Sequence, residues 1–165
     1  MGGVTIHVTG EQVEDARRLM ASSTLEAIRL IHVRAAHMTA VNCPVKSVEE
    51  KSRPSASAEI IEGGNQFRVV VSHVVIGRRE NDTEIQVDGS FELIYSIPLE
   101  TNPTSKELQA FADTNALLNC WPYWRELVRD MAARMELPPL LLPLFRLTPI
   151  YAQKQDPILT TPTSQ

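Results

Sequence analysis

The sequence predicts an α+β domain in which a four-stranded antiparallel sheet, a meander with a crossover, carries helices on one face. Three patterns lead to this prediction. Apolar and polar residues alternate over residues 85–97, as in a strand with one buried and one solvent-facing side. The nearly continuous apolar run over 67–78 predicts a central strand covered on both faces. After Pro122, apolar residues recur at helical spacing, which predicts an amphipathic helix to pack on that sheet.

The first part of the chain is expected to supply a helix and the first two strands. Thr9 and Gln12 have the spacing of a capping box, which predicts where the helix begins. The next apolar segment suits a strand or a continued helix, and we predict a strand there. The elements expected before residue 66 are a helix at 11–22, a strand at 25–38, a surface loop at 42–54 and a strand at 55–62.

From Pro98 onward the chain is expected to leave the sheet by a crossover. Thr104 and Glu107 form a second capping box and predict a helix after the crossover. The long helix is expected to begin at Pro122, because a proline loses no hydrogen bond in a first turn. It should end before Pro138, which cannot continue a helix.

Length and composition bound the class of protein. The chain of 165 residues suits one domain, which we divide into an N-terminal extension with a short helix (1–24), a main domain (25–152) and a flexible tail (153–165). The net charge of −4 lacks the basic footprint expected of a nucleic-acid-binding protein. The two cysteines lie far apart, and the N-terminus does not resemble a signal peptide. We therefore expect a cytoplasmic protein.

Groups that would carry catalysis do not converge in the sequence. The histidines are scattered, without Glu or Cys at metal-ligand spacing, and Cys120 stands in an apolar context where a thiol is usually inert. Gly63 and Gly64 lack the Lys and the Ser or Thr of a phosphate-binding loop. We therefore predict no enzymatic activity, no metal and no cofactor.

The apolar segment 140–145 is unusual, because Pro143 interrupts it and it shows neither alternation nor an amphipathic face. It is much shorter than the roughly 20 residues that a membrane span requires. Such a segment is either core, the ordinary outcome, or an open binding surface. The aromatic cluster at Trp121, Tyr123 and Trp124 leaves the same two interpretations open, packing of the helix on the sheet or lining of a groove.

Two motifs resemble the SecB export chaperone and its SecB-like relatives. Residues 121–126 read Trp-Pro-Tyr-Trp-Arg-Glu and resemble that family's aromatic-Pro-Tyr-Ala-Arg-Glu signature. Residues 137–143 resemble its aromatic-Pro-x-Leu-x-Leu-Ala-Pro segment, one residue short. The order of four strands, crossover and helices also agrees, so that the resemblance covers residues 25–152. Trp124 stands in place of a small residue and Ser90 in place of a glycine, which favours a SecB-like relative, such as those that protect an antitoxin, over the housekeeping export chaperone.

The resemblance implies an ATP-independent holdase that binds unfolded polypeptides in hydrophobic grooves and assembles as a dimer of dimers. The residues we assign to client binding are Trp121, Tyr123, Trp124, Leu140, Leu142, Leu144 and Phe145. In the family, an acidic sheet surface docks the export motor SecA, and the matching residues here are Glu84, Asp88 and Glu92. The alternatives are an adaptor for one folded partner and, third, a small-ligand-binding or enzymatic domain.

Overall fold

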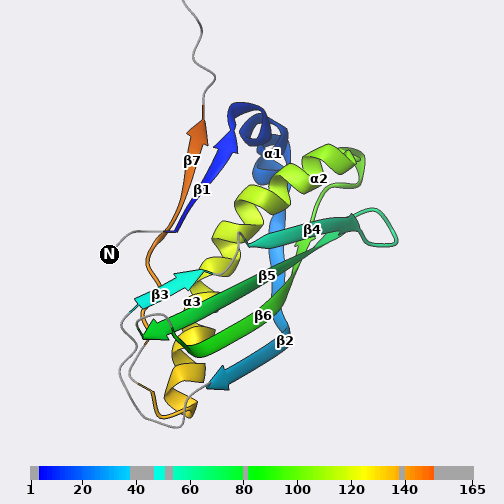
Figure 1. The fold of residues 1–165 in the computed structure, drawn as a ribbon. Helices are drawn as coiled ribbons and strands as arrows, with labels where there is room; N and C mark the ends of the chain where they lie inside the picture. Colours follow the sequence, from blue (N-terminus) through cyan, green and yellow to red (C-terminus); the bar gives the residue numbers. More distant parts are fainter. Residues whose placement is uncertain (1–3, 38–46, 51–53, 80–81, 138–139, 151–165) are drawn as a thin grey trace, which may run out of the picture.

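A computed structural model describes residues 4–37, 47–50, 54–79, 82–137 and 140–150 (Figure 1). Its strands are β1 (Val4–Thr9), β2 (Thr24–His37), β3 (Ser47–Glu50), β4 (Ser55–Ile60), β5 (Gln66–Arg79), β6 (Asp82–Ser96) and β7 (Phe145–Ile150). Its helices are α1 (Gly10–Ser22), the 3-10 turn η1 (Leu99–Thr101), α2 (Ser105–Phe111), the π-helical turn η2 (Ala112–Ala116) and α3 (Leu117–Arg134). Most of the expected loop at 42–54 and the expected tail at 153–165 lie outside the described residues.

The main sheet confirms the predicted α+β fold, with a different strand order from a simple meander. It runs β2-β6-β5, and the short strands β3 and β4 pair with successive stretches of the other edge of β5, so that the sheet is four strands wide. All neighbouring strands are antiparallel. The first strand of the sheet thus pairs with the last, β6, and not with β4.

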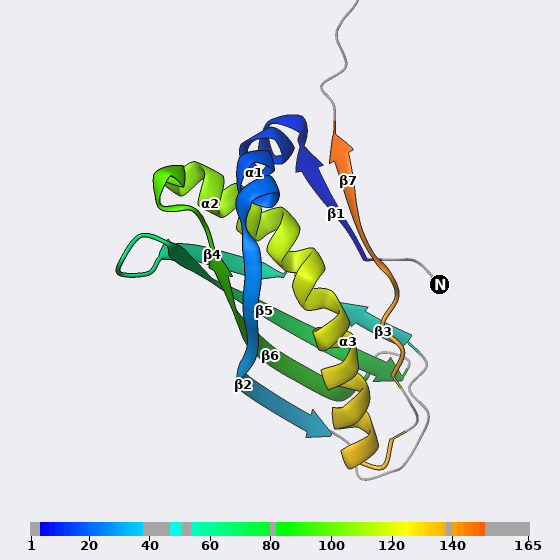
Figure 2. The same ribbon diagram turned by 180° about the vertical axis from the view of Figure 1, so that it is seen from behind.

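The helices cover one face of this sheet (Figure 2). On β6, the odd-numbered residues from Ile85 to Ile97 are buried, while Gln86 to Ser96 on the other face are half-buried. The same alternation over Phe67 to Val75 on β5 contradicts the expectation that this strand is covered on both faces. Its outward side chains, Arg68, Val70, Ser72 and Val74, are half-buried, and no described element packs over them, so the apolar run overstated the burial of β5.

The long helix starts earlier than predicted. α2, η2 and α3 follow one another from residue 105 to residue 134, so that Pro122 lies inside α3 and not in a first turn. Pro122 has no N–H to donate to the Leu118 carbonyl. Because Leu118 is exposed at the surface, water can bond to this carbonyl instead. The helix ends at Arg134, near the predicted end. Glu136 adopts a left-handed φ of 57°, and the Leu137 N–H bonds to the Ala132 carbonyl as in a Schellman motif.

A second, two-stranded parallel sheet joins β1 to β7, and the sequence did not predict it. Figure 1 shows these strands side by side next to α1, away from the main sheet. Ile6 and Val8 of β1 are buried, as are Ala16 and Leu19 of α1. The segment before residue 24 therefore holds a strand as well as the predicted helix, and both contribute to the core.

An ion pair fastens α1 to α2. Arg18 donates from Nε and Nη2 to the two carboxylate oxygens of Glu107, each at 2.8 Å, and from Nη1 to the Thr101 carbonyl at 2.8 Å. The carboxylate of Glu107 also accepts the N–H of Thr104 in the predicted capping box. The hydrogen bonds from Arg18, followed by that from Thr104, lower the pKa of Glu107 from 4.5 to about 2.

This ion pair predicts acid sensitivity. Because the pKa of Glu107 is lower in the folded chain than in the unfolded chain, the stability it contributes is complete above pH 4.5 and is lost as the pH falls towards 2. We expect Glu107→Gln to flatten the decline of the unfolding free energy over that range, measured by urea denaturation at low salt. Glu14→Gln, which removes only the exposed 3.5 Å pair of Glu14 with Arg17, is the control and should leave the decline unchanged. Parallel curves for Glu107→Gln and the unmodified chain would contradict the prediction.

Candidate functional site

The two tryptophans of the aromatic cluster lie in the core. Trp124 is fully buried and its ring stacks on His73 of β5, with centroids 5.1 Å apart and an interplanar angle of 12°. Trp121 is buried as well, and its ring centroid lies 5.6 Å from that of the same imidazole. Tyr123 points away from this cluster and is 46% exposed. Of the three aromatics in this cluster, only Tyr123 therefore offers its ring to a partner in the folded chain.

The segment from Leu140 to Phe145 divides between core and surface in the same way. Leu140 and Leu142 are buried, whereas Leu141 is 65% and Leu144 is 62% exposed. The half-buried Phe145 packs on Trp121, with ring centroids 5.0 Å apart. We call residues 140–144 the leucine segment.

Two side chains of α3 hold the leucine segment by its backbone. Trp121 Nε1 donates to the Pro143 carbonyl at 3.2 Å, and Arg125 Nε donates to the Leu142 carbonyl at 3.1 Å. These bonds satisfy backbone acceptors that a proline-broken strand could not pair in a sheet. The segment is therefore fixed along the outer side of α3, and its exposed leucines are presented by a defined backbone.

A pocket of about 270 Å³ lies between α3 and the leucine segment. It is lined by Pro122, Arg125, Glu126, Arg129, Leu140, Leu141 and Leu142. We call it the α3 pocket. Of its lining residues, only Leu140 and Leu142 were predicted to bind a client. The helical spacing of Pro122, Arg125 and Arg129 places them on one face, and this signal could have identified the pocket.

A second apolar surface follows the free edge of the main sheet. Within the described residues, β2 pairs only with β6, and its other edge has no strand beside it. Leu30 lies opposite Phe91 and Val33 lies opposite Gly89, so both side chains share the helix-bearing face of the sheet. Leu25, Leu30, Ile31 and Val33 are all exposed. This edge strand, which corresponds to the strand predicted at 25–38, is thus both apolar and open.

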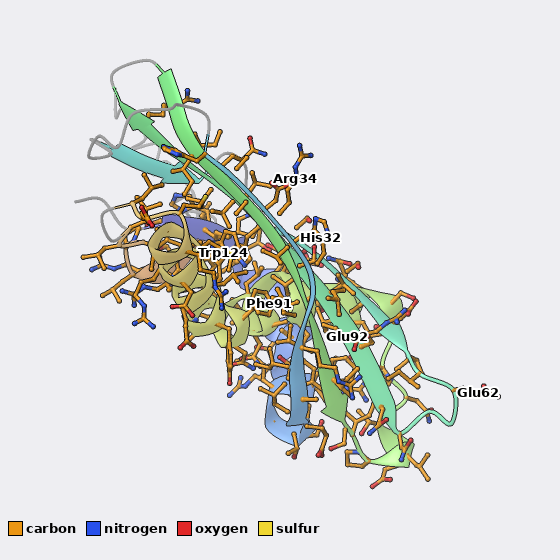
Figure 3. All side chains as sticks on the ribbon, turned by 90° about the horizontal axis from the view of Figure 1, so that it is seen from below. His32, Arg34, Glu62, Phe91, Glu92 and Trp124 are labelled. Carbon is orange, nitrogen blue, oxygen red and sulfur yellow. The ribbon has the colours of Figure 1, made fainter. Side chains whose placement is uncertain are left out.

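In the predicted acidic row on the opposite sheet face, Glu92 is neutralised by two arginines. Figure 3 shows Glu92, His32 and Arg34 on this face, with Trp124 and Phe91 on the helix-bearing side. Glu92 receives Arg29 of β2 at 3.1 Å and Arg68 of β5 at 3.5 Å. Asp88 lies opposite Arg34 and accepts a hydrogen bond from Gln86 at 3.2 Å. Glu84 belongs to β6, but its side chain lies outside the described part of the structure.

The described residues contain no group of three or more His, Cys, Asp or Glu side chains that could hold a metal ion. Burial raises the pKa of the Cys120 thiol to about 12, which makes it a poor nucleophile. Burial raises the pKa of Tyr95 to about 12 as well, although Asn119 donates a hydrogen bond to its hydroxyl. Among the described helices, none is long and apolar enough to cross a membrane.

Comparison with known proteins identifies the fold. No family model matches the sequence. SecB-like chaperone Rv1957 of Mycobacterium tuberculosis (strain H37Rv) is 27% identical over 142 residues, covering 76% of this chain and 78% of the relative. SecB-like chaperone MT2006 of the strain CDC 1551 matches equally well. The solved structure of Rv1957, bound to a ChAD peptide from the Rv1956 HigA1 antitoxin, matches with a TM-score of 0.71 and 26% identity, over 81% of this chain and 97% of that chain.

The chain is similar in sequence and fold to SecB-like chaperones. The resemblance inferred from residues 121–126 and 137–143 is thereby confirmed, together with the fold class. The relatives found are named as chaperones and not as enzymes. Within this SecB-like fold, the assignment of individual residues to client binding stays a prediction, which the burial described above narrows to Tyr123, Leu144 and the surroundings of the α3 pocket.

Proposed function

We propose that this SecB-like protein is an ATP-independent chaperone of the cytoplasm that holds non-native polypeptides, with an antitoxin as its dedicated client. The observation that carries the proposal is the structural match to a SecB-like chaperone whose solved structure contains an antitoxin peptide. The match covers 97% of that chain and 81% of this one. It therefore extends beyond a shared sheet.

The exposed apolar side chains are suited to this task. Tyr123, Leu141 and Leu144 remain in water although the helix and segment that carry them are fixed by buried neighbours. Burial of apolar surface is non-directional, so a rigid row of such side chains accepts clients of different sequence. The apolar segments of a non-native client would cover these side chains, which would keep the segments from aggregating.

The function is tested by suppression of aggregation. We expect the purified protein to slow aggregation of several unrelated unfolded clients without ATP, and to protect its antitoxin client at lower concentrations. Suppression of only one client, with no effect on the others, would instead indicate an adaptor with one dedicated partner. No effect on any client would contradict the proposal.

We also propose that two chains pair through the free edge of β2, and that two such dimers form a tetramer. An open, apolar edge strand offers unpaired N–H and C=O groups to a second copy. We expect Leu30→Lys to shift the assembly towards smaller species in light scattering. Met20→Lys, at an exposed apolar position on α1, is the matched control and should not shift it. A monomer at micromolar concentration for the unmodified chain would contradict this assembly.

A general role in export is not expected. Long-range attraction of a basic partner requires a face of unpaired negative charge, whereas Glu92 here is shared by Arg29 and Arg68. We therefore predict weak or absent SecA binding in titration calorimetry at low and at physiological salt. Sub-micromolar binding that disappears on replacing Glu84 and Asp88 with Lys would contradict this prediction and restore the role in export.

A further inference from the structure

The α3 pocket combines apolar walls with an excess of positive charge. Leu140, Leu141, Leu142 and Pro122 supply apolar surface, while the charged lining residues are two arginines and one glutamate. The chain as a whole carries a net charge of −4. The lining of this pocket therefore has the opposite sign from the chain.

Arg125 is the better placed of the two arginines. Its side chain is half-buried and, among the described residues, donates only its Nε–H, to the Leu142 carbonyl, which leaves the terminal N–H groups of the guanidinium to the pocket. No described carboxylate forms an ion pair with Arg125. Arg129, one turn further along α3, contacts Glu126 at 3.7 Å and Asp130 at 3.4 Å, and all three side chains are more than half exposed. Such surface pairs are weak and exchange partners readily.

From this arrangement we propose that the α3 pocket selects client segments in which an apolar residue stands next to Asp or Glu. The apolar side chain packs on Leu141 and Pro122, and the carboxylate lies at Arg125 and Arg129. The inference rests on the proposed function and names the class of client sequence that this site prefers.

The charge also acts against other clients. A purely apolar segment laid over the pocket would remove water from the Arg125 guanidinium without replacing its hydrogen bonds, which is unfavourable. A basic segment would meet two like charges in the lining, compensated there by Glu126 and, outside the lining, by Asp130 beside Arg129. The pocket thus discriminates by unfavourable contacts with the wrong client as well as by favourable contacts with the right one.

The test compares two fluorescently labelled ten-residue peptides that differ at one position, Leu-Leu-Glu against Leu-Leu-Gln, by anisotropy titration of the full chain. We expect the Glu peptide to bind about fivefold more tightly at low salt, as for a charge pair near a protein surface, and the preference to shrink at high salt. Because only the peptide changes, protein stability does not affect this comparison. Arg129→Gln should reduce the preference, whereas Arg134→Gln, an exposed arginine of α3 outside the pocket lining, should retain it.

Equal affinities for the two peptides would overturn the inference and leave the holding function intact. Failure of both peptides to bind would overturn the inference too, and together with unsuppressed aggregation it would overturn the proposed function. A change in oligomeric state with Arg129→Gln would show that a second copy of the chain occupies the pocket, which also overturns the inference.

Discussion

Replacing Trp124 with alanine is expected to lower the free energy of unfolding by about 3–5 kcal/mol, the range for a large buried aromatic side chain. Its indole is fully buried, stacks on His73 and covers Gly89 of β6. A methyl group added at Gly89 would lie 3.0 Å from Trp124 Cζ3 and 3.1 Å from Leu127 Cδ2. Helix and sheet therefore meet so closely at this point that a side chain at position 89 would require its neighbours to shift by a few tenths of an ångström, and removal of the indole would leave a cavity there.

The matched control is Tyr123→Ala, one residue earlier on the same helix. Because Tyr123 is 46% exposed and lies outside the core, we expect a loss of less than about 1 kcal/mol. Urea denaturation followed by far-ultraviolet circular dichroism measures both variants without relying on tryptophan emission. A further check is that Gly89→Ala should be less destabilising in the Trp124→Ala background than alone. Similar losses for Trp124→Ala and Tyr123→Ala would contradict the assignment of Trp124 to the core.

The strands of the main sheet could be predicted because their burial follows a local rule. On β6 the period-two alternation sets both the element and the buried face, and its predicted face agrees with the structure. The π-helical turn and the early start of α3 were missed because Pro122 is an ordinary signal for a helix beginning. The apolar residues before it, such as Leu117, extend the buried face across that signal.

Pairing between distant segments could not be predicted in the same way. β1 and β7 come from opposite ends of the described chain, and neither has a long alternating pattern. Pro149 in β7 also lowers the strand propensity of that segment. In the folded chain α1 contacts both of these strands and also α2. The pairing of β1 with β7 therefore depends on the tertiary structure and not on either segment alone.

The positions of the acidic residues on β6 were predicted, but the charge of the surface they belong to was not. Glu84, Asp88 and Glu92 were expected to form a row because alternate residues of a strand share a face. The arginines that neutralise Glu92 come from β2 and β5, and only the strand order brings them to it. A row of carboxylates in one strand therefore does not predict an acidic surface when the neighbouring strands are unknown.

The leucine segment offers the sharpest separation of stability from binding. We expect Leu142→Ser to lower the free energy of unfolding by about 3–5 kcal/mol, because it opens a cavity and buries a hydroxyl group among apolar neighbours. Leu144→Ser, two residues along and mostly in water, should change stability by no more than about 0.5 kcal/mol. It should nevertheless weaken client binding by up to about tenfold, since the lost side chain is one that a client would cover.

The two variants are compared by urea denaturation and by client affinity per folded molecule. Leu142 is buried and Leu144 is exposed. If the exposed leucines bind clients, Leu144→Ser should lower client affinity per folded molecule more than Leu142→Ser does. If the whole segment is core, Leu144→Ser should not lower that affinity more than Leu142→Ser does. If Leu144→Ser binds clients as tightly as the unmodified chain, its exposed side chain has no role in holding and client contact must lie elsewhere, with the open edge of β2 as the next surface to test. If Leu142→Ser remains as stable as the unmodified chain, the Leu142 side chain does not hold the leucine segment to the core, and the rigid presentation on which the proposed function depends is wrong.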